Sequence, residues 1–120
     1  MIDKEKATEY LRGLGMVSGE SSVRAGYMAL AMGLQEEMGA YKSINRYTSG
    51  TETLPQRMAT EIGRDANYVH SHMLKWLATF KRVYDASDPK YNRICTPRML
   101  EIITPLQLIY LLTCDFVDNG

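Results

Sequence analysis

The sequence of 120 residues has few of the features that mark secreted or membrane proteins. It contains only two cysteines, Cys95 and Cys114, which form no recognisable disulfide framework, and no secretory signal precedes its first predicted helix. Its most apolar run, 106–112, is far too short to cross a bilayer. We therefore expect a cytoplasmic protein with no membrane partner.

The sequence also lacks a net charge, because 14 basic residues balance 14 acidic ones. A zero net charge by itself argues against a nucleic-acid partner. The charges are unevenly placed, however: residues 64–98 contain seven basic and three acidic residues, which leaves seven basic and eleven acidic residues elsewhere. Such a local excess is compatible with a protein that binds DNA through one face.

Signatures of catalysis and of metal binding are absent as well. His70 and His72 lie two positions apart in a predicted helix, so their rings point roughly 160° away from each other and cannot share a metal ion. No Cys-x-x-Cys or His-x-x-x-His spacing occurs, and no Ser-His-Asp arrangement would be brought together by the predicted helices. We expect no enzymatic activity, no metal site and no cofactor.

What the sequence does contain is a set of helix signals spread over one domain, 1–120. Its apolar content of 45% is normal for a globular protein of this length. We divide the domain into N-terminal helices (1–41), a helix-turn-helix segment (53–84), a hairpin-like segment (85–96) and C-terminal helices (97–118).

The segment 53–76 organises the chain. Thr53 and Gln56 have the spacing of a capping box at the start of a short helix. Gly63 stands where that helix would end in a left-handed residue, and Asp65 is the natural cap of the next helix. Two helices joined by so short a turn must cross steeply, and the second then projects from a rigid base.

At about 100° per residue, the side chains of that second helix separate into two faces. The apolar face comprises Ala66, Val69, Met73, Trp76, Leu77, Phe80 and Tyr84. The opposite face comprises Asn67, Ser71, Lys75, Ala78 and Arg82, with Arg64 and Tyr68 beside them. Amides, hydroxyls and cations on a projecting helix suit base edges and phosphates. An ordinary helical hairpin with a solvated polar face is the alternative.

The flanking helices are strongly apolar. In the helix predicted over 21–41, one stripe comprises Val23, Tyr27, Leu30, Leu34, Met38 and Tyr41, and a second side holds the small residues Ala25, Gly26, Ala29 and Gly33. We prefer a dimer interface for the small side, with core packing as the alternative. Thr96 with Pro97 and Thr104 with Pro105 begin two further helices, and the second is apolar nearly all round.

The segment after the second helix is typical of a hairpin-like turn. Asp88, Pro89 and Lys90 separate two short pieces, 81–84 and 93–96, that could form strands. A brief strand is also predicted at 44–48. A solvated turn without a function is the other interpretation.

Together these features resemble winged helix-turn-helix DNA-binding proteins. The residues D-P-K-Y-N-R at 88–93 look like the wing of repressors related to multiple-antibiotic-resistance regulators. The residues V-H-S-H-M-L-K-W at 69–76 resemble a stretch of the recognition helix of arsenic-repressor-like proteins, where His72 would have a DNA-facing or framing role.

The resemblance implies a mainly helical fold with a small β-wing, and a homodimer whose N- and C-terminal helices form the interface. It also implies sequence-specific binding to double-stranded DNA, most often as a transcriptional repressor. Plasmid or phage DNA partition and a protein-interaction adaptor are the alternatives. The predicted DNA-binding residues are Arg64, Asn67, Tyr68, Ser71, Lys75, Lys81, Arg82, Lys90 and Arg93.

Overall fold

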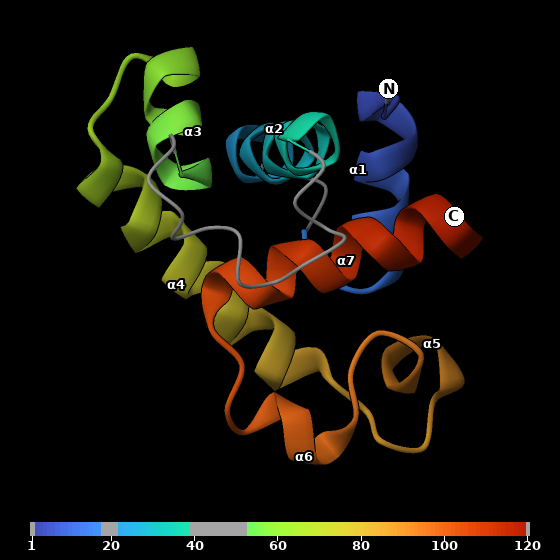
Figure 1. Ribbon diagram of the computed structural model, residues 1–120. Helices are drawn as coiled ribbons and strands as arrows, with labels where there is room; N and C mark the ends of the chain where they lie inside the picture. Colours follow the sequence, from blue (N-terminus) through green and yellow to red (C-terminus); the bar gives the residue numbers. More distant parts are fainter. Residues whose placement is uncertain (1, 18–21, 39–52, 120) are drawn as a thin grey trace.

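The computed structural model describes residues 2–17, 22–38 and 53–119, and every regular element in these ranges is a helix (Figure 1). The helices are α1 (Lys4–Gly13), α2 (Ser22–Met38), α3 (Leu54–Ile62), α4 (Ala66–Val83), α5 (Pro89–Asn92), α6 (Pro97–Leu100) and α7 (Pro105–Asn119). The strand predicted at 44–48 lies outside the described residues. Within these ranges, none of the helices combines the length and apolarity that a membrane crossing needs.

The α3–turn–α4 unit forms as its capping residues predict. The Thr53 side chain accepts from the backbone N–H of Gln56, whose side chain accepts in return from the N–H of Thr53. Gly63 ends α3 at φ 70°, and Asp65 caps α4 by accepting from the N–H of Tyr68 at 2.8 Å. Each cap satisfies a backbone donor that the helix end leaves unpaired. The helix-turn-helix prediction is therefore confirmed as local structure.

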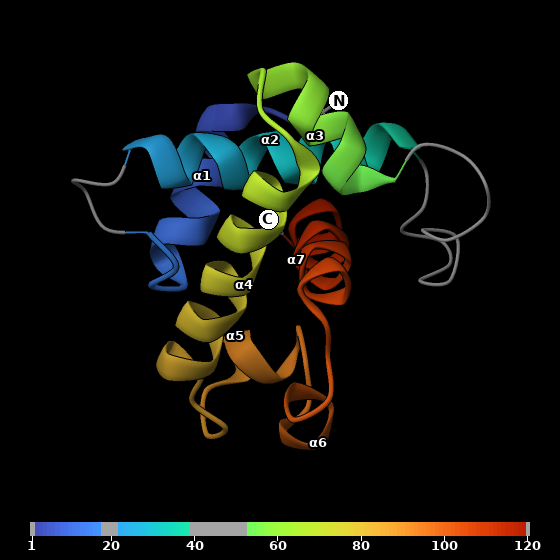
Figure 2. The same cartoon turned by 90° about the vertical axis from the view of Figure 1, so that its left-hand side faces the viewer.

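Helix α7 lies inside the fold. It packs on both α2 and α4, and Figures 1 and 2 show it running beneath α2 and alongside α4. Leu108, Ile109 and Leu112 are completely buried in the core that these helices share. The prediction that the terminal helices form a dimer interface is corrected here, because the chain itself covers much of the apolar surface of α7, with Leu106, Tyr110, Leu111 and Phe116 also partly buried against the core.

Helix α2 buries only part of the predicted stripe: Leu34 is buried, and Tyr27, Leu30 and Met38 are partly buried against the core. Its buried side chains are Ala25, Met28, Ala29, Ala31, Met32, Leu34 and Gln35. Val23, at the start of the predicted stripe, is 60% exposed. A Cβ added at Gly26 or Gly33 would meet nothing within 4 Å, so no other described part of the chain approaches these glycines closely.

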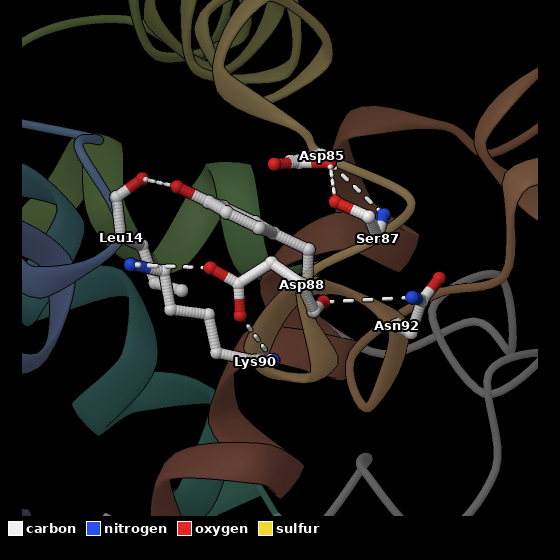
Figure 3. A network of polar contacts seen from close by, with 7 residues as sticks. Leu14, Asp85, Ser87, Asp88, Lys90 and Asn92 are labelled. Atoms are coloured by element: carbon white, nitrogen blue, oxygen red, sulfur yellow. Dashed lines mark hydrogen bonds and ion pairs between the residues drawn. The ribbon is translucent and has the colours of Figure 1, made fainter.

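The predicted β-wing is wrong. The described residues contain no strand, and Asp88 is the N-cap of α5 rather than part of a hairpin tip. The hydroxyl of Tyr91 donates to the backbone carbonyl of Leu14 at 2.9 Å, which ties α5 to the end of α1. Figure 3 shows the polar contacts of Asp88, Lys90 and Asn92 next to Leu14. Lys90 folds back onto Asp88, with Nζ 3.7 Å from a carboxylate oxygen.

The two pieces predicted as wing strands take other forms. Residues 81–83 complete the last turn of α4, and residues 93–96 connect α5 to α6. Tyr84 holds this arrangement, because its hydroxyl contacts the side-chain oxygen of Asn92 at 2.8 Å and the backbone carbonyl of Cys95 at 2.7 Å. Its ring also packs against the rings of Phe80 and Tyr91. Buried aromatic contacts thus hold a compact helical turn here.

Candidate nucleic-acid interface on helix α4

Helix α4 buries one face and exposes the other, as its periodicity predicts. Its buried side chains are Val69, Met73, Trp76, Leu77, Thr79 and Phe80. Its exposed side chains are Asn67, His70, Ser71, Leu74, Lys75, Ala78, Lys81 and Arg82. We call this exposed set the outer face of α4. The buried face anchors the helix on α3 and α7, so the outer face is presented on a rigid support.

The outer face carries positive charge only. Lys75, Lys81 and Arg82 all lie on α4, and the sequence from Ala66 to Val83 contains no aspartate or glutamate. Asp65, just before the helix, is engaged as its cap. An anion approaching this helix therefore meets three cations and no carboxylate on α4 itself.

A cluster of rings adjoins the N-terminal half of α4. We define the ring cluster as Tyr27 of α2 together with Arg64, Tyr68 and His72. The guanidinium carbon of Arg64 lies 3.8 Å from the centre of the Tyr68 ring, a cation–π geometry. The His72 ring lies edge-on to both tyrosines, with ring centres 4.7 Å from Tyr68 and 5.2 Å from Tyr27. These contacts join α2 to α4.

The ring cluster is electropositive. Partial burial lowers the pKa of His72, and the positive charges of Lys75, Arg24 and Arg64 lower it further. His72 is therefore neutral at pH 7, and a proton on it is disfavoured by three neighbouring cations. An anion placed among these groups would reverse that preference.

Sequence reasoning missed two residues of this region. Arg24 and Tyr27 belong to α2, which is separated from α4 by α3 and the segment before it. The rings of Tyr27 and Tyr68 are in edge-to-face contact, with their centres 6.4 Å apart. Nothing local in the sequence marks either residue, since only the packing of α2 beside α4 brings them to the site.

The predicted DNA-binding residues divide into two groups. Arg64, Asn67, Tyr68, Ser71, Lys75, Lys81 and Arg82 all lie on α4 or in the turn before it. Lys90 and Arg93 do not join them, because the wing that would have carried them does not form. Lys90 pairs with Asp88, and Arg93 donates from Nε to the carboxylate of Asp115 at 2.6 Å.

Other kinds of site find little support in the described residues. No group of three or more histidine, cysteine or acidic side chains in these ranges could hold a metal ion. Burial raises the pKa of both Cys95 and Cys114, so neither thiol is ionised at neutral pH. Two open depressions lie along α1 between the charged side chains of its exposed side, and no cluster of catalytic groups adjoins them.

Comparison with known proteins gives no relative from which a function could be transferred: no protein-family profile, curated protein or solved structure matches the chain.

Proposed function

We propose that this chain binds double-stranded DNA, with the outer face of α4 in the major groove, and acts as a transcriptional regulator. The observation that carries the proposal is the combination of three cations and no carboxylate on the exposed side of a helix presented by a helix-turn-helix pair. Helices of this kind enter the major groove with their N-terminal residues nearest to the bases.

The dimensions of α4 fit this use. Its 18 residues correspond to a length of about 27 Å at 1.5 Å per residue. The major groove is about 12 Å wide and admits one α-helix. Asn67 and Ser71, in the first two turns, would reach base edges, where amide and hydroxyl groups can both donate and accept.

The cations of the outer face and of the ring cluster would contact phosphates. Lys75, Lys81 and Arg82 extend along α4, while Arg64 and Arg24 stand at its N-terminal end beside His72. Phosphate contacts fix the position of a protein on the duplex and supply most of its non-specific affinity. Arg93 is left out of this set, because its guanidinium already pairs with Asp115.

We also propose that the chain forms a homodimer and is cytoplasmic, as expected from the sequence. Two copies would present two α4 helices to half-sites about 34 Å apart, one turn of the duplex. Light scattering of the chain mixed with the duplex should then give a complex with the mass of one duplex and two chains. A complex of one duplex with one chain would remove the dimer from the proposal.

The experiment is a titration of the purified chain against a fluorescent 24-base-pair duplex pool of random sequence, followed by anisotropy at several salt concentrations. Each phosphate contact makes the slope of log affinity against log salt concentration more negative by about 0.9, so three to five contacting cations predict a slope between about −2.7 and −4.5. Absence of binding at about 50 mM salt would contradict DNA as the ligand and favour a protein partner. An affinity that does not change with salt concentration would do the same.

A further inference from the structure

The outer face of α4 exposes a large apolar side chain among its polar groups. Leu74 is 49% exposed, although six other positions of the same helix are buried. A single exposed leucine is common on protein surfaces. This one stands out by its position, because it lies at the middle of the face that carries Asn67, Ser71 and Lys75.

Leu74 belongs to a narrow apolar strip. At about 100° per residue, Leu74 and Ala78 point within about 40° of each other, and the direction of Asn67 falls between them. All three side chains are exposed. The strip therefore combines one amide, from the first turn of α4, with two apolar groups about two and three turns further along.

The charges beside the strip indicate what covers it. Lys75, Lys81 and Arg82 flank it, and α4 carries no carboxylate that could pair with them. A second copy of the same helix would bring like charges together, which is unfavourable. A polyanion with an apolar group on its surface is complementary to both properties of this face.

In the major groove, only one base offers an apolar group. The thymine C5-methyl is the sole apolar feature among the four base edges, and adenine presents the N6 and N7 pair that an asparagine amide can bind with two hydrogen bonds. An A·T pair thus offers partners for both the apolar side chains and the amide of the strip.

We infer that Leu74 and Ala78 contact thymine methyl groups and that Asn67 binds adenine, so that the chain selects sites rich in A·T pairs. This inference rests on the proposed DNA binding and adds a base preference to it. Leu74 would then help to select the DNA sequence, a role that the charged and polar groups of the outer face do not explain by themselves.

The test compares two synthetic polymers that differ only in the methyl group, alternating poly(dA-dT) and alternating poly(dA-dU). Burying one methyl group changes affinity roughly fourfold, so the chain should bind the thymine polymer at least roughly fourfold more tightly. The Leu74→Ala variant should lose most of this difference. Because Leu74 is exposed, the variant should keep its helical circular dichroism and its melting temperature.

Val117→Ala is the matched control. Val117 is 46% exposed at the end of α7, so its truncation removes a similar exposed apolar group away from α4. This variant should keep the full preference for the thymine polymer.

The outcomes separate the base preference from DNA binding itself. Equal affinity of the unchanged chain for both polymers, or a preference that persists in Leu74→Ala, overturns the role of Leu74 while DNA binding stands. Binding to neither polymer at low salt overturns the proposed function and this inference together. A change in oligomeric state on Leu74→Ala would instead assign the strip to a second copy of the chain.

Discussion

Arg93 and Asp115 form an ion pair that joins the connector after α5 to α7, with Nε 2.6 Å from the carboxylate oxygen Oδ1. The carboxylate is almost fully buried, and its other oxygen accepts from the hydroxyl of Tyr10 in α1 at 2.7 Å. Asn119 donates a further hydrogen bond to Oδ1. One buried carboxylate thus connects three parts of the chain that are far apart in sequence.

Removing Arg93 should therefore weaken the fold. Without Arg93, the buried carboxylate of Asp115 loses its cation, so Arg93→Ala should lower the free energy of unfolding. Urea denaturation followed by circular dichroism measures this change. Arg98→Ala, at an exposed position of α6, should change the free energy of unfolding by less than about 0.5 kcal/mol. Equal effects of the two substitutions would show that the Arg93–Asp115 pair contributes nothing.

The stability of the fold should depend on Gly63, which forms the turn between α3 and α4. Its φ of 70° is a left-handed conformation, which costs a residue with a Cβ about 1–2 kcal/mol. Gly63→Ala should lower the free energy of unfolding by about that amount, whereas Gly63→Asn should lose less, because asparagine tolerates this conformation. Thermal melts of the three proteins provide the comparison.

Gly13→Ala is the control for that substitution. Gly13 lies in the last turn of α1 with a helical backbone and open space around the added Cβ. Alanine there should leave stability unchanged or raise it by up to about 1 kcal/mol. A Gly63→Ala protein as stable as the Gly13→Ala protein would refute the strained turn.

His72 should make DNA affinity depend on pH. Its pKa in the free chain lies below the usual 6.5, because of burial and of Lys75, Arg24 and Arg64. A DNA phosphate among these cations would raise the pKa in the complex, so binding takes up a proton and affinity rises as the pH falls from 7.5 through 6.5 towards 5.5. His72→Gln should flatten this dependence. Identical pH profiles for the two proteins would remove His72 from the phosphate contact.

The same His72 should act on stability in the opposite direction. A pKa that is lower in the folded than in the unfolded chain stabilises the fold above pH 6.5, and that stability is lost as the pH falls through the folded value. Melting temperatures of the DNA-free chain should therefore decline on acidification, and less so for His72→Gln. A decline of the same size in both proteins would place its origin in other groups.

The sequence predicted those parts of the fold that depend on neighbouring residues. The capping box of Thr53 and Gln56, the helix end at Gly63 and the helix start at Thr104 and Pro105 all formed. Each of these signals depends on groups no more than four residues apart, so it can be recognised without knowledge of the tertiary structure. The outer face of α4 was predicted for the same reason, since periodicity alone determines which side chains share a face.

The predictions were wrong where contacts between residues far apart in the sequence determine the structure. Asp88 and Pro89 are equally suited to a β-turn and to the start of a short helix, and the contact of Tyr91 with Leu14 selects the helix. Arg93 was interpreted as a phosphate contact because the buried Asp115, 22 residues away, could not be foreseen as its partner. The burial of α7 beneath α2 and α4 likewise could be recognised only from the tertiary structure.

Charge reversal on α4 tests the central claim most directly. Lys75→Glu lies on the outer face, and Lys6→Glu reverses an exposed lysine on α1 in the same way. Anisotropy with the random duplex pool at about 50 mM salt should show at least about tenfold weaker binding for Lys75→Glu, the loss expected from one phosphate contact. Lys6→Glu should bind like the unchanged chain. Equal affinities of the two variants for DNA, with both folded, would contradict the assignment of α4 as the DNA-binding helix.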